Sequence, residues 1–156
     1  MSAQLDRLPR YRRMTAADLD AIIAIEDTIY PHPWTRGNFS DSLAAGYHCW
    51  IVECGGEISG YAVVMIAAGE AHLLNLSVAA PWQRRGIGRE ALNFVIKLAR
   101  DYGAGKILLE VRPSNGAAVA LYSSAGFAEI AKRRSYYPAG DSREDASVLE
   151  LALDIA

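Results

Sequence analysis

The sequence predicts an α+β fold with a mixed, mostly antiparallel central sheet and helices on both of its faces. Two β-rich runs, residues 48–54 and 57–68, are joined by a Gly-Gly pair, which is typical of a hairpin. Further on, a helical periodicity over residues 87–102 is followed at once by another β-rich run, which indicates a β-α-β unit. A chain of 156 residues is long enough for one domain, residues 1–156, with a substantial core.

The N-terminal third is predicted to hold a short strand and two helices. Residues 8–14 form the strand. Thr15 and Asp18 resemble a capping box, with Asp in place of the usual Glu or Gln, and they start a helix that ends before Pro31. A second short helix begins near Thr35.

The remainder is predicted to alternate strands with two further helices. Residues 71–79 continue the hairpin as a third strand, and residues 106–112 form a strand after the long helix. Ser114 is the predicted cap of a helix over residues 115–125. The two closing strands and the loop between them are predicted at residues 127–134, 147–155 and 135–145. The predicted order is therefore β-α-α-β-β-β-α-β-α-β-β.

Composition excludes several classes of function. The formal net charge of −2 gives no whole-chain signature of nucleic-acid binding. No apolar run approaches the roughly 20 residues that a membrane-spanning helix requires. Residues 1–13 also lack the apolar core of a signal peptide. We therefore expect a soluble, cytoplasmic protein that contacts neither membrane nor nucleic acid directly.

The cysteines and histidines predict neither a disulfide nor a metal site. Cys49 and Cys54 lie in one predicted strand, about 16 Å apart and on opposite faces, which is too far for a disulfide. We expect two reduced thiols in the core. His32, His48 and His72 show no ligand spacing among themselves or with the cysteines.

The predicted strand over residues 106–112 carries a carboxylate among apolar residues. Alternation places Glu110 and Arg112 on one face and the most apolar residues on the other. Because burial of an unpaired carboxylate is costly, Glu110 needs a partner. The residues alone favour an ion pair between Glu110 and Arg112.

The sharpest local signal is the run Gln-Arg-Arg-Gly-Ile-Gly at residues 83–88, between an apolar strand and the long helix. Glycines let the backbone approach a ligand closely, and the free N–H groups and dipole of a helix N-terminus favour an anion. Two adjacent arginines add positive charge, so the run suits a pyrophosphate. It matches neither the P-loop nor the Rossmann glycine pattern. A plain basic turn with a helix cap fits the residues about equally well.

This run also matches the [RQ]-x-x-G-x-[GA] signature of the GCN5-related N-acetyltransferase (GNAT) family, and the order of elements resembles that family over nearly the whole chain. Residues 31–39, 109–127 and 133–151 further resemble the RimI-type branch. In particular, the run E-V-R-x-S-N-x-x-A-x-x-L-Y-x-x-x-G-F and the closing R-R-x-Y-Y-P are similar to enzymes that acetylate protein N-termini. The resemblance implies a GNAT fold and acetyl-CoA as the cosubstrate, with no metal.

The resemblance also implies a reaction. Acetyl passes directly from acetyl-CoA to the N-terminal alanine of a small-subunit ribosomal protein. Glu110 matches the family's general base, acting directly or through water, and partial burial would make it a stronger base. Tyr122 matches the general acid, although its periodicity alone favours core packing. The alternatives are other protein N-termini, a lysine side chain, a small-molecule amine, or an acetyl-CoA-binding module without activity.

The resemblance assigns the remaining site residues by position. The backbone near residues 76–78 contacts the acetyl and pantetheine portions, the arginine-glycine loop holds the pyrophosphate, and Asn115 contacts coenzyme A. Asn115 also fits ordinary hydrogen bonding at a helix start. The predicted cofactor-binding set is Leu76, Ser77, Val78, Arg84, Arg85, Gly86, Ile87, Gly88, Arg89 and Asn115.

The resemblance further implies that the regions with Trp34, Tyr136 and Tyr137 flank the groove that binds the acceptor peptide. Exposed aromatic side chains on loops suit recognition of a peptide. For the two tyrosines, packing within the loop is an equally good reading. The neighbouring charges, Asp141, Arg143, Glu144 and Asp145, are predicted to be a solvated run; the alternative is that an acidic residue among them steers a basic N-terminal tail of the acceptor.

Overall fold

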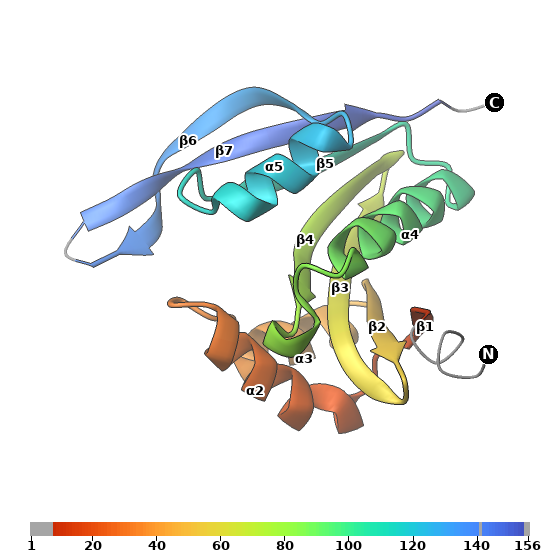
Figure 1. Ribbon diagram of the computed structural model, residues 1–156. Coiled ribbons are helices and arrows are strands. Elements are labelled where there is room, and N and C mark those ends of the chain that lie inside the picture. Colours follow the sequence, from red (N-terminus) through yellow and green to blue (C-terminus); the bar gives the residue numbers. More distant parts are fainter. Residues whose placement is uncertain (1–7, 141, 155–156) are drawn as a thin grey trace. The chain divides into compact units, whose positions relative to one another are not determined.

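The computed structural model describes residues 8–140 and 142–154, so that Asp141 and Ile155, which fall in predicted segments, lie outside the described residues. The strands are β1 (Arg10–Arg13), β2 (His48–Cys54), β3 (Glu57–Ala67), β4 (Glu70–Val78), β5 (Lys106–Val111), β6 (Ala128–Ala139) and β7 (Ser142–Ala152), and the helices are α2 (Leu19–Ile29), α3 (Arg36–Ala44), α4 (Ile87–Asp101) and α5 (Gly116–Ser124) (Figure 1). Apart from two short 3₁₀ turns, this is the predicted order of elements.

The strands form a seven-stranded sheet in the order β1-β2-β3-β4-β5-β7-β6. β1–β2, β2–β3, β5–β7 and β6–β7 pair antiparallel, whereas β4 and β5 pair parallel. The parallel pair is the predicted β-α-β unit, because α4 connects its two strands. The predicted α+β class is therefore confirmed.

The chain divides into two compact units. Unit 1 comprises residues 1–65 and 75–95, and unit 2 comprises residues 66–74 and 96–156. β3, β4 and α4 each run from one unit into the other. The single domain over residues 1–156 stays a prediction.

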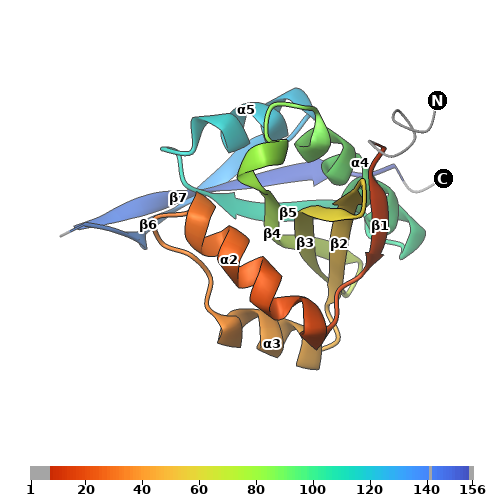
Figure 2. The same ribbon diagram turned by 60° about the horizontal axis from the view of Figure 1, so that its bottom comes forward.

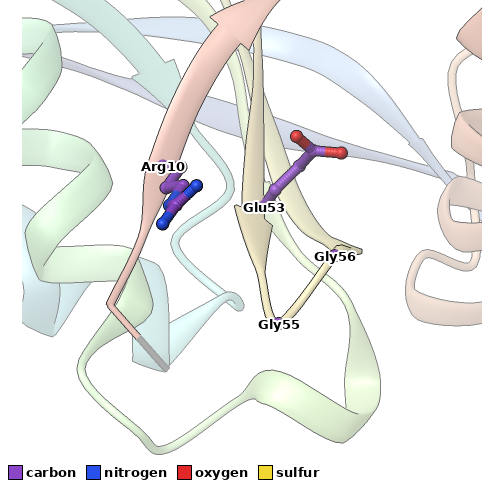
Figure 3. A pocket seen from close by; sticks show the side chains of 4 residues that line it. All are labelled: Arg10, Glu53, Gly55 and Gly56. Atoms are coloured by element: carbon purple, nitrogen blue, oxygen red, sulfur yellow. The ribbon is translucent and has the colours of Figure 1, made fainter. Parts of the chain in front are cut away.

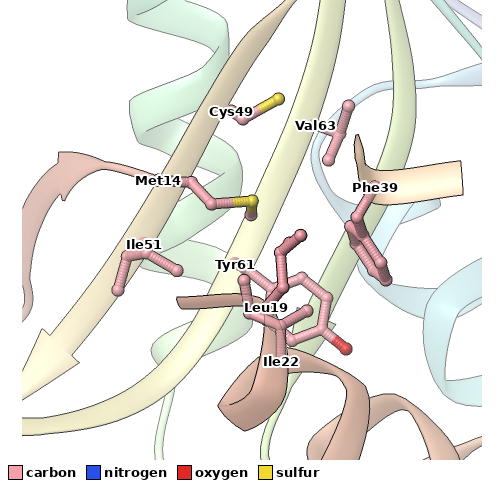
Figure 4. Close-up of a cluster of buried hydrophobic side chains, with 8 residues drawn as sticks. All are labelled: Met14, Leu19, Ile22, Phe39, Cys49, Ile51, Tyr61 and Val63. Atoms are coloured by element: carbon pink, nitrogen blue, oxygen red, sulfur yellow. The ribbon is translucent and has the colours of Figure 1, made fainter. Parts of the chain in front are cut away.

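Among the described residues of unit 1, two apolar clusters lie one on each face of β2. In the first, α2 and α3 cover β2 and β3, and both helices lie on the same side of these strands (Figure 2). Its buried members are Met14, Leu19, Ile22, Phe39, Cys49, Ile51, Tyr61 and Val63 (Figure 4). In the second, Val52 and Cys54 of β2 pack against Ile87 and Ala91 of α4. The free cysteines are thus buried in different clusters, as alternation along one strand predicts.

The predicted capping box is present. The Thr15 N–H donates to Asp18 Oδ2 at 2.8 Å, and the box starts a 3₁₀ turn, Ala16–Asp18, that continues into α2. Arg12 adds a two-pronged ion pair, donating to Oδ2 at 2.9 Å and to Oδ1 at 2.8 Å of the same carboxylate. The hydrogen bonds from Arg12 lower the pKa of Asp18. This carboxylate therefore ties β1 to the start of the first helix.

We expect Asp18→Asn to lower the free energy of unfolding by about 1–3 kcal/mol at pH 7, because an amide cannot accept both hydrogen bonds from Arg12. Since the folded pKa is depressed, the stabilisation is present above the ordinary value of 3.8 and is lost as pH falls through the folded value. Urea unfolding should therefore show a gap between wild type and variant at pH 7 that narrows below about pH 4. Asp20→Asn is the matched control, because Asp20 is 90% exposed beside Arg36. A gap that does not change with pH would contradict the assignment.

Unit 2 is built on the β5–β7–β6 ladder with α5. The burial of β5 alternates as predicted: Ile107, Leu109 and Val111 are buried, whereas Leu108 and Glu110 are half-buried. The predicted loop over residues 135–145 is wrong, because β6 runs to Ala139 and β7 begins at Ser142. Pairs such as Tyr137↔Glu144 extend the hairpin past a bulge between Arg133 and Tyr137. The Ser, Pro, Gly and Asp residues of this segment are typical of a loop, so the sequence did not predict that it pairs as two strands.

The predicted helix cap at Ser114 is also wrong. Asn115 is the N-cap of α5, and its side chain accepts a hydrogen bond from the Ala118 N–H at 3.2 Å. Ser114 instead donates to Glu144 through its backbone N–H at 2.9 Å and its hydroxyl at 2.8 Å. These bonds lower the pKa of Glu144. Glu144, one carboxylate of the predicted solvated run, is thus part of a structural connection between β7 and the start of α5.

Over the stretches that the structure describes, no helix is both long enough and apolar enough to cross a membrane.

Candidate active site

A pocket of about 300 Å³ lies at the β2–β3 turn of unit 1 (Figure 3). Its lining is Arg10, Glu53, Gly55 and Gly56. None of these residues belongs to the predicted site, and Glu53 already pairs with Arg12 at 3.2 Å. The candidate site therefore has to be located from its side chains and backbone, one unit at a time.

The predicted pyrophosphate loop precedes α4 in unit 1 and is exposed. Arg84 and Gly86 adopt left-handed backbone conformations, with φ of 62° and 81°. A Cβ at Gly86 would meet no atom within 4 Å, so the space above this backbone is open. The guanidinium of Arg85 lies 5.2 Å from the ring of Trp82. An open turn at the N-terminus of a 15-residue helix, with arginines beside it, fits a polyanion.

Apolar packing anchors both ends of this loop. Ile87 is buried, and Leu76 and Val78 pack against the same cluster. The Gln83 side chain donates to the Val78 carbonyl at 3.0 Å, which ties the loop to the end of β4. Three of the predicted cofactor-binding residues therefore contribute their side chains to the core, and only their backbone groups are candidates for a ligand.

The side chain of Ser77 belongs to a buried polar network. Its hydroxyl donates to Asn75 Oδ1 at 2.6 Å and lies 2.7 Å from the hydroxyl of Tyr30. Asn75 Nδ2 donates to Glu26 Oε1 at 3.0 Å. The Trp34 N–H donates to Glu26 Oε2 at 2.8 Å. The structure thus connects two predicted site residues, Ser77 and Trp34, through a glutamate that the sequence analysis did not select.

Glu110 lies on β5 in unit 2 with a side chain that is 29% exposed. Arg133 Nε of β6 lies 3.4 Å from Glu110 Oε1. The Tyr136 hydroxyl donates to Glu110, and this hydrogen bond raises the pKa of the phenol. Arg133 in turn lies over the ring of Tyr136 at 5.3 Å. A half-buried carboxylate is therefore held by one cation and one phenol, both from β6.

The predicted ion pair between Glu110 and Arg112 is wrong. Arg112 Nη1 donates to the Pro138 carbonyl at 2.8 Å and lies 3.4 Å from Glu144 Oε1. Its guanidinium also lies 4.4 Å from the ring of Tyr137. Residues of the β6–β7 hairpin therefore bind Arg112, and Glu110 pairs with Arg133 of β6 instead.

Tyr136 and Tyr137 differ in exposure. Tyr136 is 41% exposed, and the two rings meet edge to face at 4.9 Å. Burial and the charge of Glu110 raise the pKa of Tyr137 to about 12. Arg143 holds the bulge that places this pair, donating to the Ser135 and Tyr136 carbonyls at 2.9 and 3.1 Å. The pair is therefore fixed in place, with Tyr136 facing solvent.

Tyr122 is buried in α5 at 7% exposure, and its ring meets that of Phe127 edge to face at 5.5 Å. Its predicted neighbour Asn115 performs the helix-capping role described above. Tyr122 and Glu110 belong to the same unit. The roles of Tyr122 as an acid and of Asn115 as a coenzyme A contact stay predictions.

Sequence reasoning missed Glu26, Arg133 and Glu144. Only Glu26 left a usable signal: it follows Ile22 by four residues, so it lies on the apolar face of its helix. Arg133 and Glu144 act through strand pairing, which a single sequence does not show. Within the described residues, no group of three His, Cys, Asp or Glu side chains is placed to hold a metal ion.

The chain belongs to the acetyltransferase (GNAT) family, whose pattern it matches over residues 19–127. Among curated relatives, the [ribosomal protein bS18]-alanine N-acetyltransferase of Escherichia coli strain K12 is 35% identical over 142 residues, which are 91% of this chain and 96% of the relative. The protein of the same name from Haemophilus ducreyi is 33% identical over 87% of this chain and 94% of its own length. The crystal structure of the Escherichia coli ribosomal-protein-S18-alanine N-acetyltransferase superposes with a TM-score of 0.88 at 34% identity, covering 96% of each chain. The GNAT fold is therefore confirmed.

Proposed function

We propose that this chain transfers the acetyl group of acetyl-CoA to the N-terminal α-amine of alanine in a small-subunit ribosomal protein. The observation that carries the proposal is the likeness to the Escherichia coli bS18-alanine enzyme, which extends over 91% of this chain and 96% of that one. The basic, open loop before α4 and the half-buried Glu110 supply the two features that such a transfer needs. A cytoplasmic location agrees with two free, buried cysteines.

Acetyl-CoA, when bound, supplies a thioester carbonyl for the amine and a thiolate leaving group. The backbone N–H groups at the start of α4, with Arg84, Arg85 and Arg89 nearby, bind its pyrophosphate. Residues 76–78 of β4 present backbone groups to its acetyl and pantetheine portions.

Glu110 removes the proton that the attacking amine must lose, directly or through one water. The base is needed because an α-amine with a pKa of about 7.7–8.0 is largely protonated near neutral pH. Tyr122 gives its phenolic proton to the departing sulfur. On the acceptor side, Trp34, Tyr136 and Tyr137 contact the residues that follow the N-terminal alanine.

The test is an acetylation assay located by mass spectrometry. The substrate is a peptide with the alanine-starting N-terminus of the ribosomal protein and one internal lysine. The same peptide with a blocked α-amine, and a free polyamine, are the comparison substrates. We expect a single acetyl group on the α-amine. Acetylation of the blocked peptide on lysine, or of the polyamine at an equal rate, would favour a different member of the same family.

We expect Tyr122→Phe to lower kcat by about 10²-fold, because the variant keeps its ring against Phe127 and loses the proton that the hydroxyl would transfer. Steady-state kinetics with thermal melts separate a loss of catalysis from a loss of stability. Tyr102→Phe is the matched control, since Tyr102 is 53% exposed on unit 2. A kcat within a factor of about two of wild type would remove Tyr122 from the acid role.

A further inference from the structure

Glu26 is a fully buried carboxylate that accepts hydrogen bonds from neutral donors. It is 1% exposed on α2, at the position where the helix meets the first apolar cluster of unit 1. Its three hydrogen bonds come from the Tyr61 hydroxyl at 2.8 Å, the Asn75 amide at 3.0 Å and the Trp34 backbone at 2.8 Å. Burial and the charge of Glu26 raise the pKa of Tyr61, so this phenol remains a donor. Figure 4 shows the Tyr61 hydroxyl at the edge of the apolar cluster.

Stability alone does not account for a carboxylate at this position. An apolar side chain would fill the same helical face, and buried charges give little or no net stabilisation compared with well-packed apolar groups. A carboxylate differs from an apolar group in accepting several hydrogen bonds at once. Glu26 uses this capacity to connect three separate segments of unit 1.

The first connection reaches the segment between α2 and α3. Glu26 Oε2 accepts from the Trp34 N–H, and the Trp34 ring lies 5.1 Å from that of Phe39. Phe39 meets Tyr61 edge to face at 5.7 Å, and Tyr61 returns to Glu26 Oε1. Trp34 is therefore fixed through both its backbone and its ring.

The second connection reaches β4. Glu26 Oε1 accepts from Asn75, Asn75 Oδ1 accepts from the Ser77 hydroxyl, and that hydroxyl lies against the Tyr30 hydroxyl. Tyr30 is the C-cap of α2, directly after its last residue. One carboxylate thus sets both the segment with Trp34 and the strand residues next to the thioester in the proposed reaction.

We infer that Glu26 is a positioning residue for the acceptor: it holds the Trp34 segment and the Asn75–Ser77 stretch of β4 in one arrangement, so that acceptor peptide and thioester are presented together. The inference rests on the proposed function for the identity of the acceptor. It makes no use of proton transfer by Glu26.

Glu26→Gln tests the inference with little change in shape. A glutamine oxygen can still accept from Tyr61 and Asn75, but the amide nitrogen then faces the Trp34 N–H, and two donors cannot bond. Ile22→Val is the matched control. It removes one methylene from the same helix and the same apolar cluster, and it leaves every hydrogen bond in place.

Two measurements are made on the full chain at a temperature where all variants are folded. In steady-state kinetics, we expect Glu26→Gln to raise KM for the alanine-starting peptide about 10-fold, the equivalent of one lost hydrogen bond to a charged group. KM for acetyl-CoA changes by less than about twofold. In amide hydrogen exchange, the Trp34 N–H loses protection in Glu26→Gln and keeps it in Ile22→Val.

Each outcome of these two measurements supports or overturns the positioning role of Glu26. Equal effects of Glu26→Gln and Ile22→Val on the peptide KM, or unchanged Trp34 exchange in Glu26→Gln, would overturn the inference. If wild type acetylates no peptide, the proposed acceptor fails, while the exchange measurement still decides whether Glu26 positions Trp34. Loss of Trp34 protection together with a rise in the peptide KM supports the inference.

Discussion

Glu110→Gln should lower kcat by about 10²–10³-fold at pH 7, the usual contribution of a positioned general base. The side chain keeps its size and its place on β5, so that binding of acetyl-CoA should be nearly unchanged. The variant loses the ability to take a proton from the incoming ammonium. Steady-state kinetics with the alanine-starting peptide, and calorimetric titration of acetyl-CoA, measure the two quantities separately.

The pH dependence sharpens this prediction. Above about pH 9 most of the α-amine is already neutral, so the difference between Glu110→Gln and wild type should shrink. Glu150→Gln is the matched control: it makes the same change on β7, opposite Leu108, in a side chain that pairs with Lys106 at 3.8 Å. Turnover of Glu110→Gln near the wild-type rate at pH 7 would end the assignment of Glu110 as the base.

The neighbours of Glu110 show how far the sequence could lead. Alternation along β5 correctly placed Glu110 on the half-buried face, because it depends only on adjacent residues. The predicted partner was wrong: Arg112 is two residues from Glu110 and on the same face of the predicted strand, but β5 ends at Val111. The sheet order β5-β7-β6 instead brings Arg133 and Tyr136 to the carboxylate. Pairing across strands is set by the fold as a whole, which local pattern does not encode.

The prediction of helices and strands likewise succeeded where the signal is local and failed where pairing between strands decides. Helices with strong caps, at Thr15 and Thr35, and the hairpin at the Gly-Gly turn were predicted correctly, since their signals lie within a few residues. The missed strand residues after Arg134 are only partly buried at most, and they include turn-forming types such as Ser135 and Pro138. They form a strand because β7 pairs with them, and Arg143 and Glu144 hold the hairpin to its surroundings.

Glu26 shows a different limit. A charge on the apolar face of an amphipathic helix is visible in the sequence, but it is equally typical of a side chain that reaches solvent. Only the fold reveals that Tyr61, Asn75 and Trp34, from three separate segments, converge on it. The sequence therefore shows that Glu26 is unusual, but it does not show which residues the carboxylate holds.

Gly60→Ala should be the most destabilising of the substitutions considered, by about 2–3 kcal/mol, with a fall in Tm of about 5–10 °C. A Cβ at this position on β3 would lie 2.4 Å from the Ser77 carbonyl oxygen and 3.5 Å from the Val78 Cα. Both contacts are with backbone, which cannot swing aside, so β3 and β4 must separate there. The neighbouring bond from the Ala79 N–H to the Ser59 carbonyl, now 2.8 Å, should weaken with them.

The same displacement moves the backbone of residues 76–78, so KM for acetyl-CoA should rise in Gly60→Ala even where the variant remains folded. Gly37→Ala is the matched control, because its Cβ on α3 would meet only Thr35 Oγ1 at 3.6 Å, an ordinary contact. We expect that substitution to raise the free energy of unfolding by about 0.5–1 kcal/mol through helix propensity. Differential scanning calorimetry and acetyl-CoA titration of the two variants give the comparison. If Gly60→Ala is destabilised but binds acetyl-CoA with unchanged affinity, the packing of β3 against β4 does not affect cosubstrate binding. That result would argue against backbone recognition of acetyl-CoA by residues 76–78.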